Sequence, residues 1–279
     1  MKKIYTLILT GMLCSISYAD DITMKFTYEN FNFENSKKKD NGKRFDTLID
    51  YKTDNTLYQF MYEKTDTDTF KPPLTKNLHV NKYYLKYSYK IGNKDVFTAS
   101  YASIDDNIMK ETDGGHIYGL GYKNGMFGLN QYFSDYENFN VYQTDLKYTF
   151  RKAFGEMKTS ATLLGKYIHL QDKNSNDFSA NAQEDYFTPG IKIHTHYKDY
   201  HLGAGAFFGK RAFAVMNDGF RIQHHAMEFD ETYMFGLGKH FTDLDVNLRY
   251  IYQKATELPI NNDDVKVKNI TIQIGYHFN

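Results

Sequence analysis

The chain has 279 residues, and its 34 basic side chains balance its 34 acidic ones, so the net charge is zero. This balance gives no support for binding to nucleic acid or to an anionic surface. The mean hydropathy of -0.62 is that of a polar chain, yet 17% of the residues are aromatic, which is too many for a disordered chain.

The N-terminal segment has the organisation of a secretory signal. Two lysines and the apolar run 4–16 are followed by a small-x-small cleavage site that ends at Ala19. We predict that residues 1–19 are a signal peptide and that residues 20–279 are the mature chain. The run is too short to span a membrane as a helix. Cys14, the only cysteine, would leave with the signal, and bulky residues before it disfavour the alternative of a lipoprotein anchor.

Along the mature chain, apolar and polar residues alternate with a period of two. Clear examples are 81–91, 141–151 and 243–254, where Tyr, Phe, Leu or Val oppose Lys, Arg, Asp or Asn. This period is that of a β-strand with one apolar and one polar face. No mature segment approaches about 18 continuous apolar residues, so membrane-spanning helices are excluded.

The breaks between these strands alternate between short turns and longer polar connections. The short turns are 53–55, 92–94, 123–125, 151–155, 197–200 and 242–243. The longer connections are 35–43, 65–77, 105–115, 137–140, 171–183, 215–223 and 257–264. They predict about fourteen strands, or about twelve if a break such as 137–140 is a bulge. No linker or repeat divides the chain, so a single domain is expected over 20–279.

This pattern favours a membrane barrel over a soluble β-sandwich. Outer-membrane barrels combine long strands with short periplasmic turns and longer external loops. Aromatic residues such as Tyr250, Tyr252, Tyr148 and Phe150 end the apolar faces, whereas Leu, Val and Ile occupy the middles. Rings with a polar tip are favoured at a lipid–water interface. We therefore predict an all-β fold, a transmembrane antiparallel up-and-down β-barrel.

The last strand carries the most specific motif. Apolar residues occupy every second position up to the penultimate one, and they are Ile270, Ile272, Ile274, Tyr276 and Phe278. The chain resembles bacterial outer-membrane porins, whose final strand alternates in this way and ends in an aromatic residue; here Asn279 follows the phenylalanine. The resemblance implies that these five residues are a membrane-insertion signal read by the barrel-insertion machinery. It also implies an outer-membrane location among lipids and a monomer like the small fourteen-stranded general porins or twelve-stranded oligosaccharide channels.

Charged residues on the polar faces are the candidate lining of the barrel. They are Lys25, Glu29, Arg44, Asp46, Asp50, Lys52, Lys82, Lys86, Asp145, Lys147, Arg151, Lys192, Asp245, Arg249, Lys266 and Lys268. So many charges cannot form a dry core, so we predict a water-filled lumen with a mild preference for anions. Fourteen strands leave an aqueous path unless a loop folds inward. The predicted function is passive transport of small hydrophilic solutes and ions through a porin channel, and the sequence leaves the solute open.

An enzyme, such as a protease or lipid hydrolase, and a structural or adhesive barrel are the alternatives. The mature chain has no His-x-Ser pair, and histidines of the longer connections, such as His116, His169 and His224, are scattered. They form no recognisable catalytic constellation, so no enzyme is predicted. His194 and His196 could share a metal ion, but no third ligand is in view. No metal and no cofactor are therefore predicted.

Overall fold

A computed structural model describes residues 21–69, 76–109, 112–173, 181–224 and 226–278, so the predicted signal peptide lies outside the described residues. Nearly all of the described chain is β-structure. The barrel strands are β1 (Asp21–Glu34), β2 (Lys39–Lys52), β3 (Thr56–Thr69), β4 (Leu78–Ile91), β5 (Asp95–Asp106), β6 (His116–Asn124), β7 (Phe127–Asp135), β8 (Asn140–Phe154), β9 (Met157–Gln171), β10 (Asp185–Tyr197), β11 (Tyr200–Phe207), β14 (Met227–Phe241), β15 (Leu244–Glu257) and β16 (Asn262–Phe278). Within the described ranges, no helix is long and apolar enough to cross a membrane.

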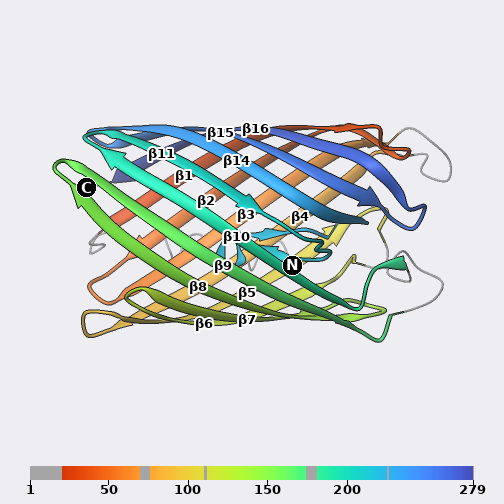
Figure 1. Cartoon of the computed structure of the whole chain (residues 1–279), viewed down its shortest axis with the longest axis horizontal. Helices are drawn as coiled ribbons and strands as arrows, with labels where there is room; N and C mark the ends of the chain where they lie inside the picture. Colours follow the sequence, from red (N-terminus) through yellow and green to blue (C-terminus); the bar gives the residue numbers. More distant parts are fainter. Residues whose placement is uncertain (1–20, 70–75, 110–111, 174–180, 225, 279) are drawn as a thin grey trace, which may run out of the picture.

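These fourteen strands close into one barrel (Figure 1). Neighbouring strands are antiparallel and follow one another in sequence, and β16 returns to pair with β1 from Ile22 opposite Phe278 to Glu34 opposite Lys266. This closure leaves neither terminal strand with an unpaired edge. The predicted up-and-down barrel is confirmed. It has fourteen strands rather than twelve, because 136–139 joins two separate strands, β7 and β8.

The short turns gather at one end of the barrel, together with the end of β16, and the longer connections gather at the other (Figure 1). We call these the short-turn end and the long-loop end. Three turns fall at the predicted positions 53–55, 92–94 and 242–243. Gly92 and Gly155 each have a φ of 60° in such turns, a conformation that glycine adopts without steric cost.

Two of the predicted longer connections are short turns, because strands extend into them. In 257–264, only 258–261 separates β15 from β16. The polar stretch 35–43 was expected to be a loop, but β2 begins at Lys39 and only the turn 35–38 separates it from β1. Gly42 lies in this part of β2 against the ring of Phe31, since a Cβ at this position would lie 2.0 Å from Cε2 of Phe31. The absence of a side chain admits the ring of Phe31 into the barrel, whereas polar composition alone indicated a loop.

The outer face of the barrel changes character along its axis. On β16 the outward side chains of an apolar band, each 44–54% exposed, are Ile270, Ile272, Ile274, Tyr276 and Phe278. Beyond this band, toward the long-loop end, the outer face carries ion pairs such as Lys268 with Glu34 and Lys254 with Glu231. We call this polar zone the outer collar.

Two residues that were predicted to line the lumen belong instead to the outer collar. Lys266 and Lys268 have the same parity as Ile270 and face outward, whereas Val265 and Val267 face inward and are 1% and 4% exposed. A strand sends alternate side chains to opposite faces. The two lysines are therefore the polar continuation of the apolar band and do not line the lumen.

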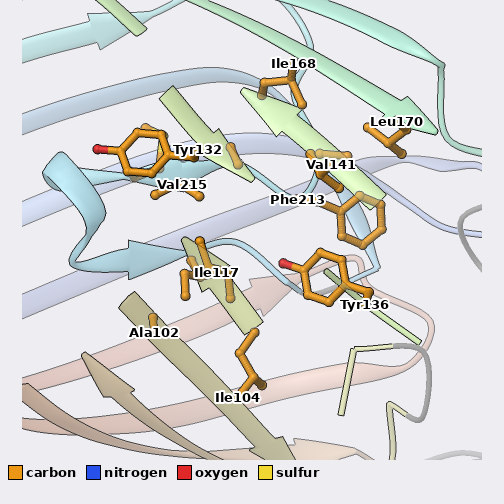
Figure 2. Packing of buried hydrophobic residues seen from close by; sticks show 14 of the residues in the cluster. Ala102, Ile104, Ile117, Tyr132, Tyr136, Val141, Ile168, Leu170, Phe213 and Val215 are labelled. Atoms are coloured by element: carbon orange, nitrogen blue, oxygen red, sulfur yellow. The ribbon is translucent and has the colours of Figure 1, made fainter. Parts of the chain in front are cut away.

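The inside of the barrel at the long-loop end is a packed apolar core (Figure 2). Its buried wall residues include Ile104 of β5, Ile117 of β6, Val141 of β8, and Ile168 and Leu170 of β9. Phe213 fills the space between them and is fully buried, with its ring centroid 4.8 Å from that of Phe139. We call this core the apolar plug. It replaces, at this end, the water-filled lumen that the sequence predicted for the whole barrel.

Candidate functional site in the barrel lumen

Residues 208–224, between β11 and β14, fold into the barrel (Figure 1). Two short strands, β12 (Val215–Met216) and β13 (Arg221–Ile222), pair with each other in a separate two-stranded sheet. The tip between them is the 3₁₀ turn Asn217–Gly219, whose three residues have φ of 50°, 56° and 101°. Asn, Asp and Gly are the residue types that best tolerate such values. We call residues 208–224 the lumen hairpin.

The sequence predicted 215–223 as a longer connection, but not that it folds inward. Its polar tip has the composition of a solvated loop. The prediction therefore rested on the tip and left out the apolar run that precedes it. Residues 212–215 of that run are each at most 1% exposed. An apolar run inside a connection is usually buried. This run was therefore the sequence signal from which an inward fold could have been inferred.

Arg211 holds the base of the lumen hairpin. Its backbone N–H and C=O bond to Phe229 of β14 at 2.9 and 2.8 Å. Its buried guanidinium lies between two rings, with Cζ 5.6 Å from the centroid of Phe207 and 5.5 Å from that of Phe229. The same group donates to Gln223 Oε1 at 3.1 Å and to the hydroxyl of Thr232. The side chain thus ties β11, β14 and the returning arm of the hairpin together.

A wall glutamine pairs with the first arm of the hairpin. Gln143 of β8 accepts a hydrogen bond from Val215 N at 2.8 Å and donates to Val215 O at 2.7 Å, as a neighbouring strand would. Lys166 of β9 donates to the same carbonyl at 3.1 Å and forms an ion pair with Asp145. All three side chains are at most 3% exposed, so the arm is fixed by buried, satisfied polar contacts.

The tip crosses the lumen to the opposite wall. Asp218 forms an ion pair with Lys147 of β8, and its carbonyl accepts a hydrogen bond from Lys86 of β4 at 2.9 Å. A Cβ at Gly219 would lie 3.8 Å from Cβ of Ser100 on β5. Because β4 and β5 lie opposite β11 and β14 in the strand order, the hairpin divides the interior.

Glu29 is the most connected carboxylate on the inner wall. Arg221 of the lumen hairpin donates two hydrogen bonds to it, at 2.8 and 3.2 Å, and Arg44 of β2 donates one at 2.9 Å. Asn269 and Thr271 of β16 complete its shell at 2.8 and 2.9 Å. Glu29 is fully buried, so its charge is stabilised by these donors and not by water.

Besides Arg211 and Arg221 of the hairpin and Lys123 of β6, the sequence missed charged residues of the inner wall such as Glu63 and Lys166. Glu63 of β3 pairs with Lys82 at 2.8 Å and lies 3.9 Å from Arg44, and Lys166 pairs with Asp145. Glu63 and Lys166 lie on the inward parity of their strands. Applying the period of two throughout β3 and β9 would have found them.

Two hollow regions flank the hairpin tip toward the short-turn end. The first has a volume of about 400 Å³, and its lining includes Asp218 and five lysines, which are Lys86, Lys123, Lys147, Lys166 and Lys192. We call it the basic chamber. The second has a volume of about 360 Å³, shares Lys192 and Asn217 with the first, and adds Arg249, His194 and His201. Basic side chains therefore dominate the charged lining of both chambers.

Comparison with solved structures supports the fold. The Acinetobacter baumannii outer membrane protein Omp33 matches over 92% of this chain and 99% of its own, with 10% identity and a TM-score of 0.51. A bacterial polysaccharide outer membrane secretin matches over 92% and 98%, with 8% identity and a TM-score of 0.58. The chain has the fold of an outer-membrane barrel. No protein-family model and no curated protein matches the sequence.

The remaining predicted lining residues occupy inward positions of this outer-membrane barrel. They are Lys25, Glu29, Arg44, Asp46, Asp50, Lys52, Lys82, Lys86, Asp145, Lys147, Arg151, Lys192, Asp245 and Arg249. They do not form a single row of charges along the lumen. Glu29, Arg44, Asp46, Lys82 and Asp145 are buried around the hairpin. Others lie nearer the short-turn mouth, where Lys25 pairs with Asp50 at 2.9 Å.

The histidines considered for catalysis are not brought together. His116 Nδ1 lies 2.8 Å from the hydroxyl of Tyr101, and His169 Nδ1 lies 2.9 Å from Asp185 Oδ1. His224 is fully buried inside the outer-membrane barrel and not at its rim. Among the described residues, these contacts assemble no nucleophile with a base and an orienting acid.

Cysteine labelling tests the phase of β15. Asp245, Asn247 and Arg249 face the lumen, whereas Val246 and Leu248 face outward. Single cysteines at the first three positions should react with a membrane-impermeant maleimide in the folded, membrane-embedded protein, and those at the last two should not. The opposite pattern would mean that the strand is out of register by one residue.

Proposed function

We propose that the protein is an outer-membrane channel that conducts small hydrophilic solutes, preferentially anions, past the lumen hairpin. The basic chamber is the observation that carries this proposal. It places five lysines and one aspartate around about 400 Å³. A low-dielectric wall of one charge sign focuses its field into the lumen and concentrates ions of the opposite sign.

The lysines differ in whether a carboxylate of the hairpin or of the barrel wall neutralises them. Lys147 pairs with Asp218, and Lys166 pairs with Asp145. Lys192 contacts the ring of Phe207, with Nζ 5.6 Å from the centroid. Lys192 lines both chambers. We infer that Lys192 attracts anionic solutes, whereas Lys147 and Lys166 mainly hold the constriction.

The surface is consistent with a membrane location. The apolar band would face lipid, the outer collar would face headgroups and solution, and the short turns would face the periplasm. The predicted signal peptide would direct export, and Ile270, Ile272, Ile274, Tyr276 and Phe278 would be the insertion signal. Closure of the barrel within one chain is consistent with a monomer. Enzymatic and structural roles remain alternatives that conductance measurements distinguish.

Single-channel recording in planar bilayers tests the proposal. The wild-type protein should give unit steps with a reversal potential that favours anions. The double variant Lys123→Glu/Lys192→Glu should lose this preference or reverse it, most strongly at low salt where screening is weak. Neither lysine forms an ion pair with the hairpin among the described residues, so the constriction should remain.

Lys254→Glu/Lys268→Glu is the matched control, because it makes the same double charge change on the outer collar. It should leave the reversal potential unchanged. Folded barrels, identified by faster gel migration without boiling, that give no conductance would contradict a channel. A cation preference in the wild type would contradict the role of the basic chamber.

A further inference from the structure

A second cluster lies at the short-turn mouth, apart from the lumen hairpin. His240 of β14, Asp245 of β15 and His277 of β16 meet there. His240 Nδ1 lies 2.7 Å from Asp245 Oδ1, and His277 Nε2 lies 2.7 Å from Asp245 Oδ2. One ligand atom from each residue lies within 4.8 Å of the other two.

Strand register explains how three adjacent strands bring these groups together. His240 is directly opposite Asp245, and the residue opposite Asp245 on the other side is Gly275. A Cβ on Gly275 would lie 3.5 Å from Cβ of Asp245. His277 follows two residues later on the same inward face of β16. The glycine leaves room for the carboxylate, so that an imidazole can approach it from each side.

Two imidazole nitrogens and a carboxylate are a donor set that zinc and related divalent metals prefer. Such metals bind these ligands at about 2.0–2.2 Å, so a tetrahedral site requires nitrogen–oxygen separations of about 3.4 Å. The present separations are 2.7 Å. Small side-chain rotations can widen these nitrogen–oxygen separations, because His240, Asp245 and His277 are 49%, 23% and 30% exposed.

The surroundings fit a metal site in two further ways. The other ring nitrogen of His277, Nδ1, lies 3.0 Å from the hydroxyl of Thr23. Metal-ligating histidines are commonly oriented by such a hydrogen bond on the second nitrogen. The neighbouring cation Lys25 is paired with Asp50 at 2.9 Å, so its charge is locally balanced and repels a bound metal only weakly.

We propose that His240, Asp245 and His277 form a binding site for a divalent transition metal of the zinc class, open to solution at the short-turn mouth. Each imidazole would give the nitrogen that now faces Asp245. That nitrogen must be deprotonated when the metal binds. The partial exposure of the three side chains leaves at least one coordination position for water or another ligand. This site does not depend on conduction by the barrel.

Metal titration of the tag-free, chelator-treated, folded protein tests the site. Cobalt(II) should bind with one ion per chain and give the visible absorption of a tetrahedral complex, and zinc should displace it. His240→Ala and His277→Ala should each lower the affinity at least about 100-fold, and Thr23→Val should lower it about 10- to 100-fold. Heat-modifiable gel migration verifies that each variant is folded.

Two control variants separate this site from other histidines. His116→Ala changes a histidine that contacts Tyr101, and it should leave the affinity unchanged. His201→Ala changes a histidine that contacts Asn247 and lies near His194 and His196, and it should also have no effect. Loss of binding in His201→Ala alone, unchanged affinity in both His240→Ala and His277→Ala, or no binding by the wild type would overturn the proposal.

Discussion

Deletion of the lumen hairpin should raise the single-channel conductance several-fold. The variant removes residues 212–225 and joins Arg211 to Ala226 through two glycines. Arg211 is kept because its backbone pairs with Phe229. The deletion removes Phe213 from the apolar plug and Asp218 from the wall of the basic chamber. A fourteen-stranded barrel without an inward segment is wide enough for a continuous aqueous path.

A disulfide provides the complementary test, because it fixes the hairpin where the structure places it. The Cβ–Cβ distance of 3.8 Å between Ser100 and a residue at Gly219 matches the mean for disulfides, about 3.8 Å. The double variant Ser100→Cys/Gly219→Cys should therefore crosslink within one chain on oxidation. Gly219 has a φ of 101°, so the substitution costs about 1–3 kcal/mol. The only native cysteine lies in the predicted signal peptide and does not compete.

The two variants together decide the role of the hairpin. Oxidised Ser100→Cys/Gly219→Cys should keep the low conductance of the wild type, in contrast to the deletion variant, and reduction of the disulfide should leave it unchanged. Unchanged conductance in folded deletion protein would show that the hairpin is not the constriction. Failure of the folded double variant to crosslink would show that the tip does not lie against β5.

The outer surface of this barrel could be predicted because lipid imposes a simple rule on every strand. Ile270, Ile272 and Ile274 alternate with polar residues, and the structure pairs them on both sides and leaves them facing outward. Turns such as 92–94 could also be predicted from local sequence, since glycine and short polar runs end strands directly. Strand number and fold class followed from these local signals.

The interior could not be predicted in the same way, because it depends on where one connection folds. Val215 meets Gln143, and Arg221 meets Glu29, and these residues are far apart in sequence. No periodic pattern records such contacts. Lys266 and Lys268 were misplaced for a simpler reason. A charged side chain was interpreted as facing the lumen. Charged side chains also lie on the outer collar, where the strand extends beyond the apolar band.

The same long-range contacts make Glu29 the side chain whose loss should cost most stability. Glu29→Gln keeps the size of the side chain but removes the charge shared by Arg44 and Arg221. Arg44 keeps Asp46 at 3.4 Å, whereas among the described residues Arg221 forms an ion pair only with Glu29. Removing one partner of a buried ion pair typically costs about 3–5 kcal/mol, because the other charge is left uncompensated.

Urea unfolding of the barrel in lipid vesicles measures this cost. Circular dichroism and gel migration are suitable probes, since the chain contains no tryptophan. Glu34→Gln is the matched control on the same strand, because Glu34 pairs with Lys268 on the partly exposed outer collar. That change should cost about 0–1 kcal/mol. Equal destabilisation by the two variants would contradict a buried Glu29 cluster.

In bilayers, Glu29→Gln should also add transitions to higher conductance, because Arg221 then no longer holds the returning arm of the hairpin to the wall.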